Sequence, residues 1–276
     1  MTYLMSIILG FVQGVAEFLP ISSSGHLSIF QTWFGLEEPD NLFNVLLHFA
    51  TLIAVCAVYW RDIRDMILEF FRGVAALADR RGERGNVPPA RRLVMMVILG
   101  TLPLFLVLPV ESKVEALGGS NLFVGIALLF TGVILFASDR MARGRKTART
   151  ATVKDALLVG CAQAVAVVPG LSRSGCTIAA GMALGFERTF AVRFSFLLSL
   201  PAVLGATLLK VIDVAKDGVD PALLPIYLVG MVVAGVVGYF AIRLVNLLAQ
   251  KNKFGRFAYY CWAMGLAAIV VSFIVR

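Results

Sequence analysis

The chain has 276 residues, of which 59% are hydrophobic and only 15% are charged, and its mean hydropathy is +0.86. A soluble domain carries about 25% charged residues, so this composition excludes a soluble protein and predicts an integral membrane protein. The net charge of +8 does not indicate nucleic-acid binding, because the basic residues fall in short connections between apolar runs, where they mark topology and contact lipid headgroups.

The first half of the chain begins with two short apolar segments, about 3–18 and 24–35, which flank the polar stretch 20–26. Neither reaches the roughly 20 residues that a membrane-spanning helix needs. Pro20 and Gly25 interrupt helices, so we predict two re-entrant half-helices here. Three apolar runs that are long enough to span the bilayer follow, at about 42–60, 92–110 and 121–138.

The second half repeats this order. Short apolar segments at about 154–168 and 175–185 flank a second polar stretch, 169–177, in which Pro169 and Gly170 break the helix. Three long runs follow again, at about 189–212, 222–248 and 257–275. The expected fold is an all-α polytopic integral membrane protein with about six transmembrane helices and four re-entrant half-helices.

The charges of the connections predict the side of the membrane on which each connection lies, because Lys and Arg accumulate in short cytoplasmic loops. Three connections are strongly basic and are expected to be cytoplasmic: 61–92 with eight Arg, 139–154 with six Lys or Arg, and 249–256 with three. Three others are acidic or nearly neutral and are expected outside: 36–41, 111–120 and 213–221. If each half-helix pair makes no net crossing, the six spans alternate between the two sides without conflict.

The two polar stretches belong to an internal repeat. Between residues 10–27 and 160–177, seven of eighteen aligned positions are identical, and they include Gly10 with Gly160, Gln13 with Gln163, and Ser22 with Ser172. Three spans separate the copies, so the two halves are expected to run in opposite orientations through the membrane. The sequence therefore predicts an inverted-topology repeat within a single membrane domain, 1–276, with repeat one at about 1–138 and repeat two at about 154–276.

The polar stretches predict a shared anion site. Unwound backbone inside a membrane is tolerated only where it lines a cavity or is packed within protein, so the two stretches should face each other across an internal pocket. Each stretch precedes a half-helix, whose free N–H groups and positive dipole end favour an anion. Arg173 adds a guanidinium fork that suits phosphate oxygens. The predicted ligand is a phosphate group.

The first stretch carries groups of a different kind. Gln13 and Glu17 lie four residues apart on one helical face, and Ser22, Ser23, Ser24 and His26 follow them. A hydroxyl near an imidazole is the minimal arrangement for an activated nucleophile, and a nearby carboxylate orients the imidazole or holds a divalent cation. Phosphoryl transfer needs little beyond such positioning and charge neutralisation. One half is expected to bind the anion while the other reacts with it.

Residues 13–26 and 168–177 closely resemble the two signature motifs of the undecaprenyl-diphosphatase family, the bacitracin-resistance proteins, and residues 191–201 are also similar to that family. The resemblance implies removal of the terminal phosphate from a C55 isoprenyl diphosphate. That reaction recycles the lipid carrier for peptidoglycan synthesis and cell-wall biogenesis. It also implies a bacterial cytoplasmic (inner) membrane location, with an active site that faces outward and membrane lipids as neighbours.

The resemblance also implies roles for single residues. Ser23 is the expected nucleophile, His26 its acid/base partner, and Glu17 the carboxylate that handles a proton or a metal, with Mg or Ca as the expected divalent cation. The residues expected to hold the diphosphate are Arg173, Ser172, Ser174, Thr177, Ser22 and Gln13. The family has Glu or Gln at the position of Gln13, so this site has one charge fewer than a site with two carboxylates.

Alternatives remain open at this point. Ser22, Ser24 or a metal-bound water competes with Ser23 as the attacking group, because any of three adjacent hydroxyls can also cap the following half-helix. An inverted repeat with broken helices is also the architecture of a secondary transporter or a lipid-phosphate flippase. His48 is expected to make an interhelical hydrogen bond. Glu187, Arg188 and Arg193 are expected to pair with one another or to contact headgroups or the diphosphate.

Overall fold

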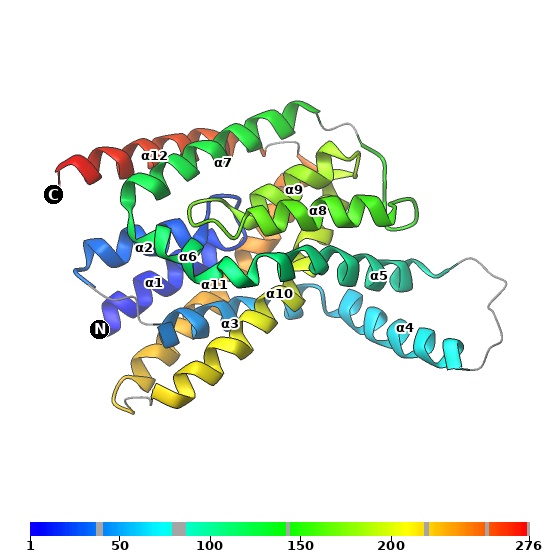
Figure 1. The fold of residues 1–276 in the computed structure, drawn as a ribbon, viewed down its shortest axis with the longest axis horizontal. Coiled ribbons are helices and arrows are strands. Elements are labelled where there is room, and N and C mark those ends of the chain that lie inside the picture. Colours follow the sequence, from blue (N-terminus) through cyan, green and yellow to red (C-terminus); the bar gives the residue numbers. More distant parts are fainter. Residues whose placement is uncertain (37–40, 79–86, 142–143, 218–220, 252–253, 275–276) are drawn as a thin grey trace.

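A computed structural model describes residues 1–36, 41–78, 87–141, 144–217, 221–251 and 254–274. The fold over these residues is helical, and the described part of the chain contains no strand beyond one isolated bridge between Lys146 and Phe186 (Figure 1). Among the described residues, five helical stretches are long and apolar enough to span a membrane, and they are Pro89–Val110, Asn121–Arg140, Arg188–Leu209, Leu224–Gln250 and Arg256–Ile274. The bent helix pair Leu42–Val58 and Trp60–Ala76 makes a sixth if it is counted as one span. The prediction of an all-α polytopic membrane protein is confirmed.

The α-helices lie in the chain order that the apolar runs predicted. They are α1 (Tyr3–Ala16), α2 (Ser23–Trp33), α3 (Asn41–Val58), α4 (Trp60–Ala78), α5 (Pro89–Thr101), α6 (Glu111–Ala116), α7 (Asn121–Met141), α8 (Val153–Val165), α9 (Arg173–Ala183), α10 (Arg188–Asp217), α11 (Leu224–Gln250) and α12 (Arg256–Ile274). Three short 3₁₀ helices accompany them: η1 (Leu102–Leu106), η2 (Leu108–Val110) and η3 (Leu117–Gly119). The four predicted half-helices are α1, α2, α8 and α9, each between 11 and 14 residues long.

Two segments differ from the sequence prediction. The connection 61–92 is largely helical, because α4 continues directly from α3 after a bend of 85°. The expected span 92–110 is an α-helix only as far as Thr101 and then continues as η1 and η2. Pro103 and Pro109 lie in these 3₁₀ segments, and each lacks the N–H that an α-helix needs. The apolar length needed for a span is kept, but its second half is not α-helical.

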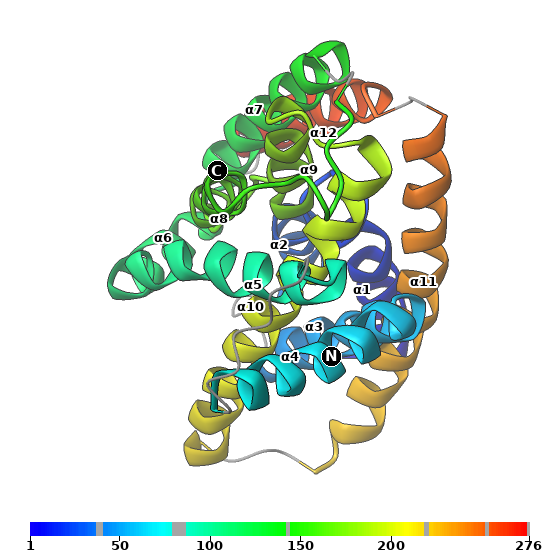
Figure 2. The same cartoon turned by 90° about the vertical axis from the view of Figure 1, so that its right-hand side faces the viewer.

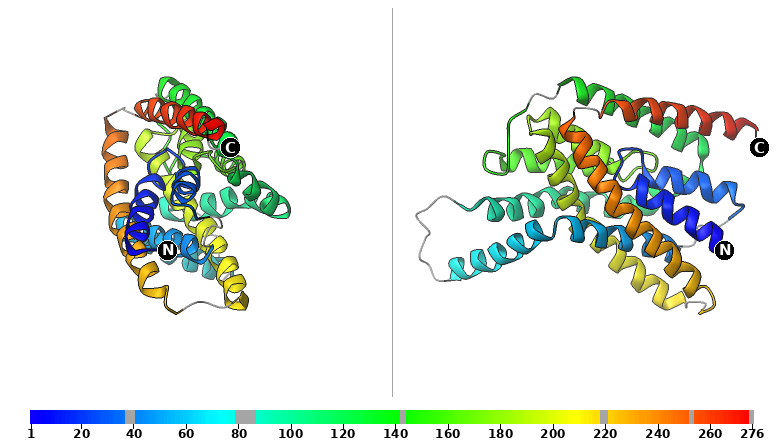
Figure 3. Two further views of the ribbon diagram at one scale, coloured as in Figure 1. Left: turned by 90° about the vertical axis from the view of Figure 1, so that its left-hand side faces the viewer. Right: turned by 180° about the vertical axis from the view of Figure 1, so that it is seen from behind.

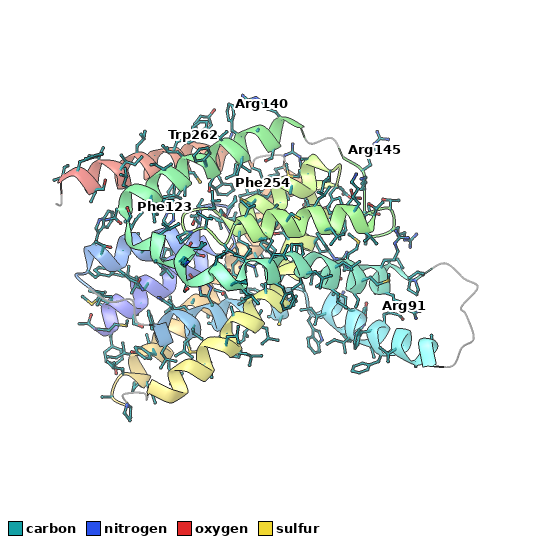
Figure 4. The ribbon with its side chains drawn as sticks, in the orientation of Figure 1. Arg91, Phe123, Arg140, Arg145, Phe254 and Trp262 are labelled. Atoms are coloured by element: carbon teal, nitrogen blue, oxygen red, sulfur yellow. The ribbon has the colours of Figure 1, made fainter. Side chains whose placement is uncertain are left out.

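Two of the half-helices, α2 and α9, lie between the long helices. Seen from one end, α7 and α12 lie along one side and α11 along another, with α2 and α9 between them (Figure 2). Trp262 of α12 donates a hydrogen bond to the Leu129 carbonyl of α7 (3.2 Å), and it lies between these two helices in Figure 4. The long helices therefore flank α2 and α9, which begin at the polar stretches, while α1 and α8 each keep an exposed face.

The half-helices approach long helices closely enough to leave no room for a side chain. α1 packs against α11 (Figure 3, right), where a Cβ on Gly10 would lie 2.4 Å from the Gly230 carbonyl oxygen. α8 packs against α5, where a Cβ on Gly160 would lie 2.2 Å from the Gly100 carbonyl oxygen. Equivalent glycines thus make equivalent contacts in the two halves. This supports the inverted-topology repeat and its boundaries, which stay a prediction.

These contacts predict the effect of a single methyl group. Gly160→Ala is expected to lower the free energy of unfolding by about 1–3 kcal/mol, because the added Cβ would overlap backbone atoms that cannot rotate away. Gly235→Ala in α11 is the matched control, since its Cβ would meet nothing nearer than 3.5 Å. The thermal unfolding midpoints of the two variants are measured in detergent. Equal midpoints for Gly160→Ala and Gly235→Ala would contradict the packing argument.

Basic loop residues lie toward one end of the molecule. In Figure 4, Arg91 and Arg145 lie at the end opposite Phe123, which stands near the beginning of α7. Both arginines come from connections that the charge pattern assigns to the cytoplasm. The predicted outside connection 36–41 falls mainly on residues outside the described ranges. The orientation of the protein in the membrane stays a prediction.

Candidate active site

The turn between α1 and α2 brings a carboxylate against a hydroxyl. Glu17 follows the last residue of α1 and Ser23 is the first residue of α2, and the Ser23 hydroxyl donates to Glu17 Oε2 at 2.6 Å. Ser22, between them in the turn, has a φ of +71°, in the left-handed region that non-glycine residues rarely adopt. Such strain costs about 1–3 kcal/mol and gathers at functional sites, where the surroundings hold it.

The second polar stretch reaches the same carboxylate. The Arg173 guanidinium forms an ion pair with Glu17 Oε1, which joins residues 156 positions apart. Glu17 is 7% exposed, so its charge is neutralised by a single close partner in a mostly buried position. The Ser174 hydroxyl adds a long contact with the Leu19 carbonyl of the first stretch (3.4 Å). The prediction that the two stretches face each other is confirmed.

Ser22 and Ser172 are equivalent N-caps. The Ser22 hydroxyl accepts a hydrogen bond from the Gly25 N–H (3.3 Å) at the start of α2, and the Ser172 hydroxyl accepts one from the Gly175 N–H (3.1 Å) at the start of α9. This is the pair of positive helix ends that the sequence predicted.

A cavity of about 380 Å³ lies where the stretches meet. Its polar lining comes from both halves of the chain and includes Glu17, Ser23, Ser24, His48, Gln163, Ser172, Arg173 and Ser174. Most of the rest of the lining is apolar and comes from η1, η2 and α10, including Leu104, Phe105, Val107, Leu108, Val203 and Leu209. The cavity therefore offers a charged, hydroxyl-rich region beside a surface that suits a hydrocarbon chain.

His26 is paired differently from the expectation. Its Nδ1–H donates to the Ser22 carbonyl oxygen (2.8 Å), and its Nε2 lies 2.8 Å from the Tyr260 hydroxyl of α12, with the two rings stacked. In the neutral ring, Nε2 accepts from that hydroxyl. The group beside the Ser23 hydroxyl is thus the Glu17 carboxylate and not the imidazole. The imidazole is buried and holds the carbonyl of the strained residue Ser22.

Tyr260 tests what the imidazole contributes. Tyr260→Phe keeps the stacked ring and removes the hydroxyl, so we expect a loss of about 1 kcal/mol in the free energy of unfolding and a fall of about fivefold in turnover, through a looser turn at Ser22. Thermal unfolding and a phosphate-release assay measure the two effects. Tyr259→Phe, at the exposed neighbouring position, is the control. Identical behaviour of the two variants would show that the hydroxyl is dispensable.

Gln13 and His48 extend the network around Glu17. The Gln13 amide donates to Glu17 Oε2 (3.1 Å) and to His48 Nδ1 (3.0 Å), and His48 Nδ1 lies 3.5 Å from the same carboxylate oxygen. The predicted interhelical hydrogen bond of His48 is confirmed, since it joins α3 to α1. His48 also lines the cavity. A lone histidine in an apolar run was the only sequence signal for this position.

Some predicted site residues lie outside the cavity lining. Thr177 is buried, and its hydroxyl lies 2.6 Å from the Ser195 hydroxyl and donates to the Arg173 carbonyl (2.9 Å), so it fixes α9 against α10. Ser22, His26 and Gln13 are not part of the lining. Gln13 donates to the lining residues Glu17 and His48, and His26 donates to the Ser22 carbonyl. Arg188 pairs with Asp139 and Arg193 with Asp62, away from the cavity.

The donor set fits a cation only in part. Within the described residues, no group of three His, Cys, Asp or Glu side chains is placed to hold a metal ion. Glu17 is the single carboxylate in the cavity lining, and both of its oxygens already accept hydrogen bonds. Mg²⁺ is often bound by one carboxylate together with substrate phosphates, and this site fits a cation held in that way. It does not fit a cation held by protein side chains alone.

Comparison with known proteins agrees with the family resemblance of the two motifs. A model of the family described as bacitracin resistance protein BacA matches residues 6–267. A protein of Methanosphaera stadtmanae named undecaprenyl-diphosphatase is 38% identical, over 99% of this chain and 99% of that protein. Proteins of the same name from Methanobrevibacter smithii (40% identical; 99% of this chain, 98% of that protein) and Halothermothrix orenii (37%; 96% and 96%) are similarly close.

Proposed function

The chain belongs to the bacitracin resistance protein BacA family, and from this premise we propose that it hydrolyses undecaprenyl diphosphate to undecaprenyl phosphate and inorganic phosphate. It is a membrane hydrolase that returns the lipid carrier to peptidoglycan synthesis. Removal of the diphosphate form also accounts for the resistance to bacitracin in the family's name. The match over nearly the whole chain supports the activity, and the cavity supports the substrate class.

One observation carries the proposal. The Ser23 hydroxyl, the Glu17 carboxylate and the Arg173 guanidinium meet in one chain of contacts at a cavity whose other lining is largely apolar. The guanidinium binds the phosphates of the substrate, and the apolar surface binds its isoprenyl chain. The hydroxyl and the carboxylate that acts as its base carry out the reaction. A transporter of a lipid phosphate would need the first and third of these features but not the second.

The contacts indicate a sequence of two displacements. The Ser23 oxygen attacks the terminal phosphorus while its proton passes to Glu17 Oε2, and the bond from that phosphorus to the bridging oxygen breaks. Undecaprenyl phosphate leaves with the bonding electrons, and a phosphoserine remains. Arg173 shifts from Glu17 to the transferred phosphate and neutralises its charge as it moves.

Water then completes the reaction. Glu17 passes the first proton to solvent, accepts a proton from the water as it attacks the phosphorus, and returns that proton to the Ser23 oxygen as the Ser23–phosphorus bond breaks and inorganic phosphate leaves. Ser24 also lines the cavity and remains a second candidate for the attacking hydroxyl, but the 2.6 Å bond to a carboxylate favours Ser23. Ser22 is engaged as the cap of α2. Direct attack by a bound water would bypass the phosphoserine.

Glu17, together with phosphate oxygens of the substrate, would hold a divalent cation, which we propose to be Mg or Ca. When bound, it adds positive charge next to the departing phosphates. The protein is proposed to lie in the bacterial inner membrane, and the segregation of basic connections supports the orientation of its spans. The outward-facing site is proposed from the family resemblance. Cysteines placed near residue 24 and probed with membrane-impermeant reagents test that orientation.

Phosphate release from undecaprenyl diphosphate by the purified protein tests the function. We expect release by the wild type and its loss in Ser23→Ala, and a ³²P label on the terminal phosphate should be trapped on Ser23 after a rapid acid quench. A chelator should reduce the rate if the cation is part of the site. Absence of release with any divalent cation, together with lipid-phosphate movement across vesicles, would favour a transporter.

A further inference from the structure

One buried side chain of the cavity has no role in the chemistry described so far. Gln163 lies on α8 and is 1% exposed, yet it is part of the cavity lining. Neither its amide nitrogen nor its amide oxygen has a hydrogen-bond partner among the described residues. A buried amide without partners costs free energy, so such a group in a functional cavity calls for a partner that comes from outside the protein.

The amide nitrogens of the other buried glutamines of the two polar half-helix pairs do have partners, although the amide oxygen of Gln13 has none among the described residues. Gln13, at the equivalent position of the first repeat, donates to Glu17 and His48. Gln31 of α2 donates to the Asn44 side chain of α3 (3.0 Å). Val167 stands where the repeat would place a counterpart of Glu17, so α8 provides no carboxylate for its glutamine. Gln163 is therefore left with its donors and its acceptor facing the cavity.

The position of α8 indicates which part of a ligand the amide would meet. Gln163 lies in the last turn of α8, and Ala166 and Val167 directly follow the end of that helix; all three line the cavity. The same helix packs against η1, which supplies Leu104 and Phe105 to the apolar surface. Glu17 and Ser23, which act on the terminal phosphate, come from the α1–α2 turn. The amide thus stands on the wall that adjoins the hydrocarbon surface.

We propose that the Gln163 amide binds the lipid-linked phosphate of the substrate, the phosphate that stays on the isoprenyl chain. This rests on the proposed function. An amide offers two N–H donors to phosphate oxygens and one acceptor to a bound water or a P–OH group. The lipid-linked phosphate gains negative charge as the leaving group, and a donor directed at it stabilises that charge. Gln163 is then a substrate-binding residue supplied by the second half of the chain, in addition to Arg173.

Gln163→Met tests the proposal, because methionine has nearly the same length and no hydrogen-bonding amide. We expect kcat/KM for undecaprenyl diphosphate to fall about ten- to a hundredfold, the cost of losing a hydrogen bond to a charged group. The thermal unfolding midpoint of the ligand-free protein should rise, because an unsatisfied buried amide is removed. A role in packing alone predicts the opposite pair: unchanged kinetics and a lower midpoint.

Gln31→Met is the matched control, since Gln31 is also buried but has a partner and does not line the cavity. It is expected to lower the unfolding midpoint and to leave kcat/KM unchanged. If Gln163→Met lowers the midpoint as Gln31→Met does, with kcat/KM within about twofold of the wild type, the proposal is overturned.

Binding measurements separate this proposal from the proposed function. The ligand-induced rise in unfolding midpoint is measured with farnesyl diphosphate, farnesyl phosphate and farnesol. Gln163→Met should weaken both phosphorylated ligands about tenfold and leave farnesol unchanged. A loss confined to the diphosphate would overturn the assignment to the lipid-linked phosphate, and so would equal binding by variant and wild type. If the wild type binds these ligands but releases no phosphate, the hydrolytic function fails while the binding role of Gln163 stands.

Discussion

Replacing Glu17 with Gln is expected to lower kcat for phosphate release by about 10³-fold, because the amide keeps the shape of the side chain but cannot take the Ser23 proton. KM should change much less, since Ser172, Ser174 and Arg173 still line the cavity. Steady-state release from undecaprenyl diphosphate, measured against lipid concentration in mixed micelles, separates the two parameters.

The control for this prediction is Glu187→Gln, at an exposed position outside the cavity lining where the carboxylate accepts from Thr189 (2.9 Å). It should retain wild-type kcat. A Glu17→Gln protein whose kcat stays within about threefold of the wild type would exclude Glu17 as the proton acceptor and would point to His48, the histidine of the cavity lining, as the base. The unfolding midpoint of each variant shows whether a lost rate reflects a lost fold.

The second large effect is expected for Arg173→Lys, which keeps the charge but loses the planar fork. We expect kcat/KM to fall about 10²- to 10³-fold, the usual consequence of removing one donor that is directed at developing charge. The reason is geometric: the guanidinium has to reach Glu17 in the resting protein and the phosphate during transfer, and an ammonium has a single centre for both.

Arg188→Lys is the comparison for that substitution, because Arg188 also pairs with a carboxylate, Asp139, but lies outside the cavity lining. It should affect stability and leave kcat/KM near the wild-type value. Inorganic phosphate, as a product inhibitor, gives an independent check. Its inhibition constant should rise in Arg173→Lys and stay unchanged in Arg188→Lys, and equal constants would argue against phosphate binding by Arg173.

Much of this molecule is predictable from hydropathy and from two motifs. Apolar length alone placed α7, α10, α11 and α12, because a bilayer sets a minimum length for a span. The short lengths of α1, α2, α8 and α9 followed from proline and glycine positions. The contact between the two polar stretches followed from the absence of any other way to bury unwound backbone.

The remaining features depend on contacts that no local pattern encodes. The sequence predicts a connection where α4 lies, because the stretch 61–92 carries eight Arg and such a charge marks a cytoplasmic segment. Arginine is also a good helix former, so the same residues are compatible with a helix. The pairing of His26 with Tyr260 joins residues 234 positions apart, and a tyrosine in an apolar span carries no signal of such a role. The identity of Gln163 with Gln13 in the repeat could have pointed to this residue. It does not show that the Gln13 amide nitrogen has partners and the Gln163 amide has none.

The ion pair between Glu17 and Arg173 also sets a condition on how the protein is made. The two residues are 156 positions apart, so at about 5–20 residues per second the ribosome adds Arg173 about 8–30 s after Glu17. During that interval the first half of the chain enters the membrane with a carboxylate that has no counter-charge. Insertion of the second half then supplies the guanidinium. The Glu17–Arg173 ion pair, and with it the complete site, therefore forms only after α9 has been made.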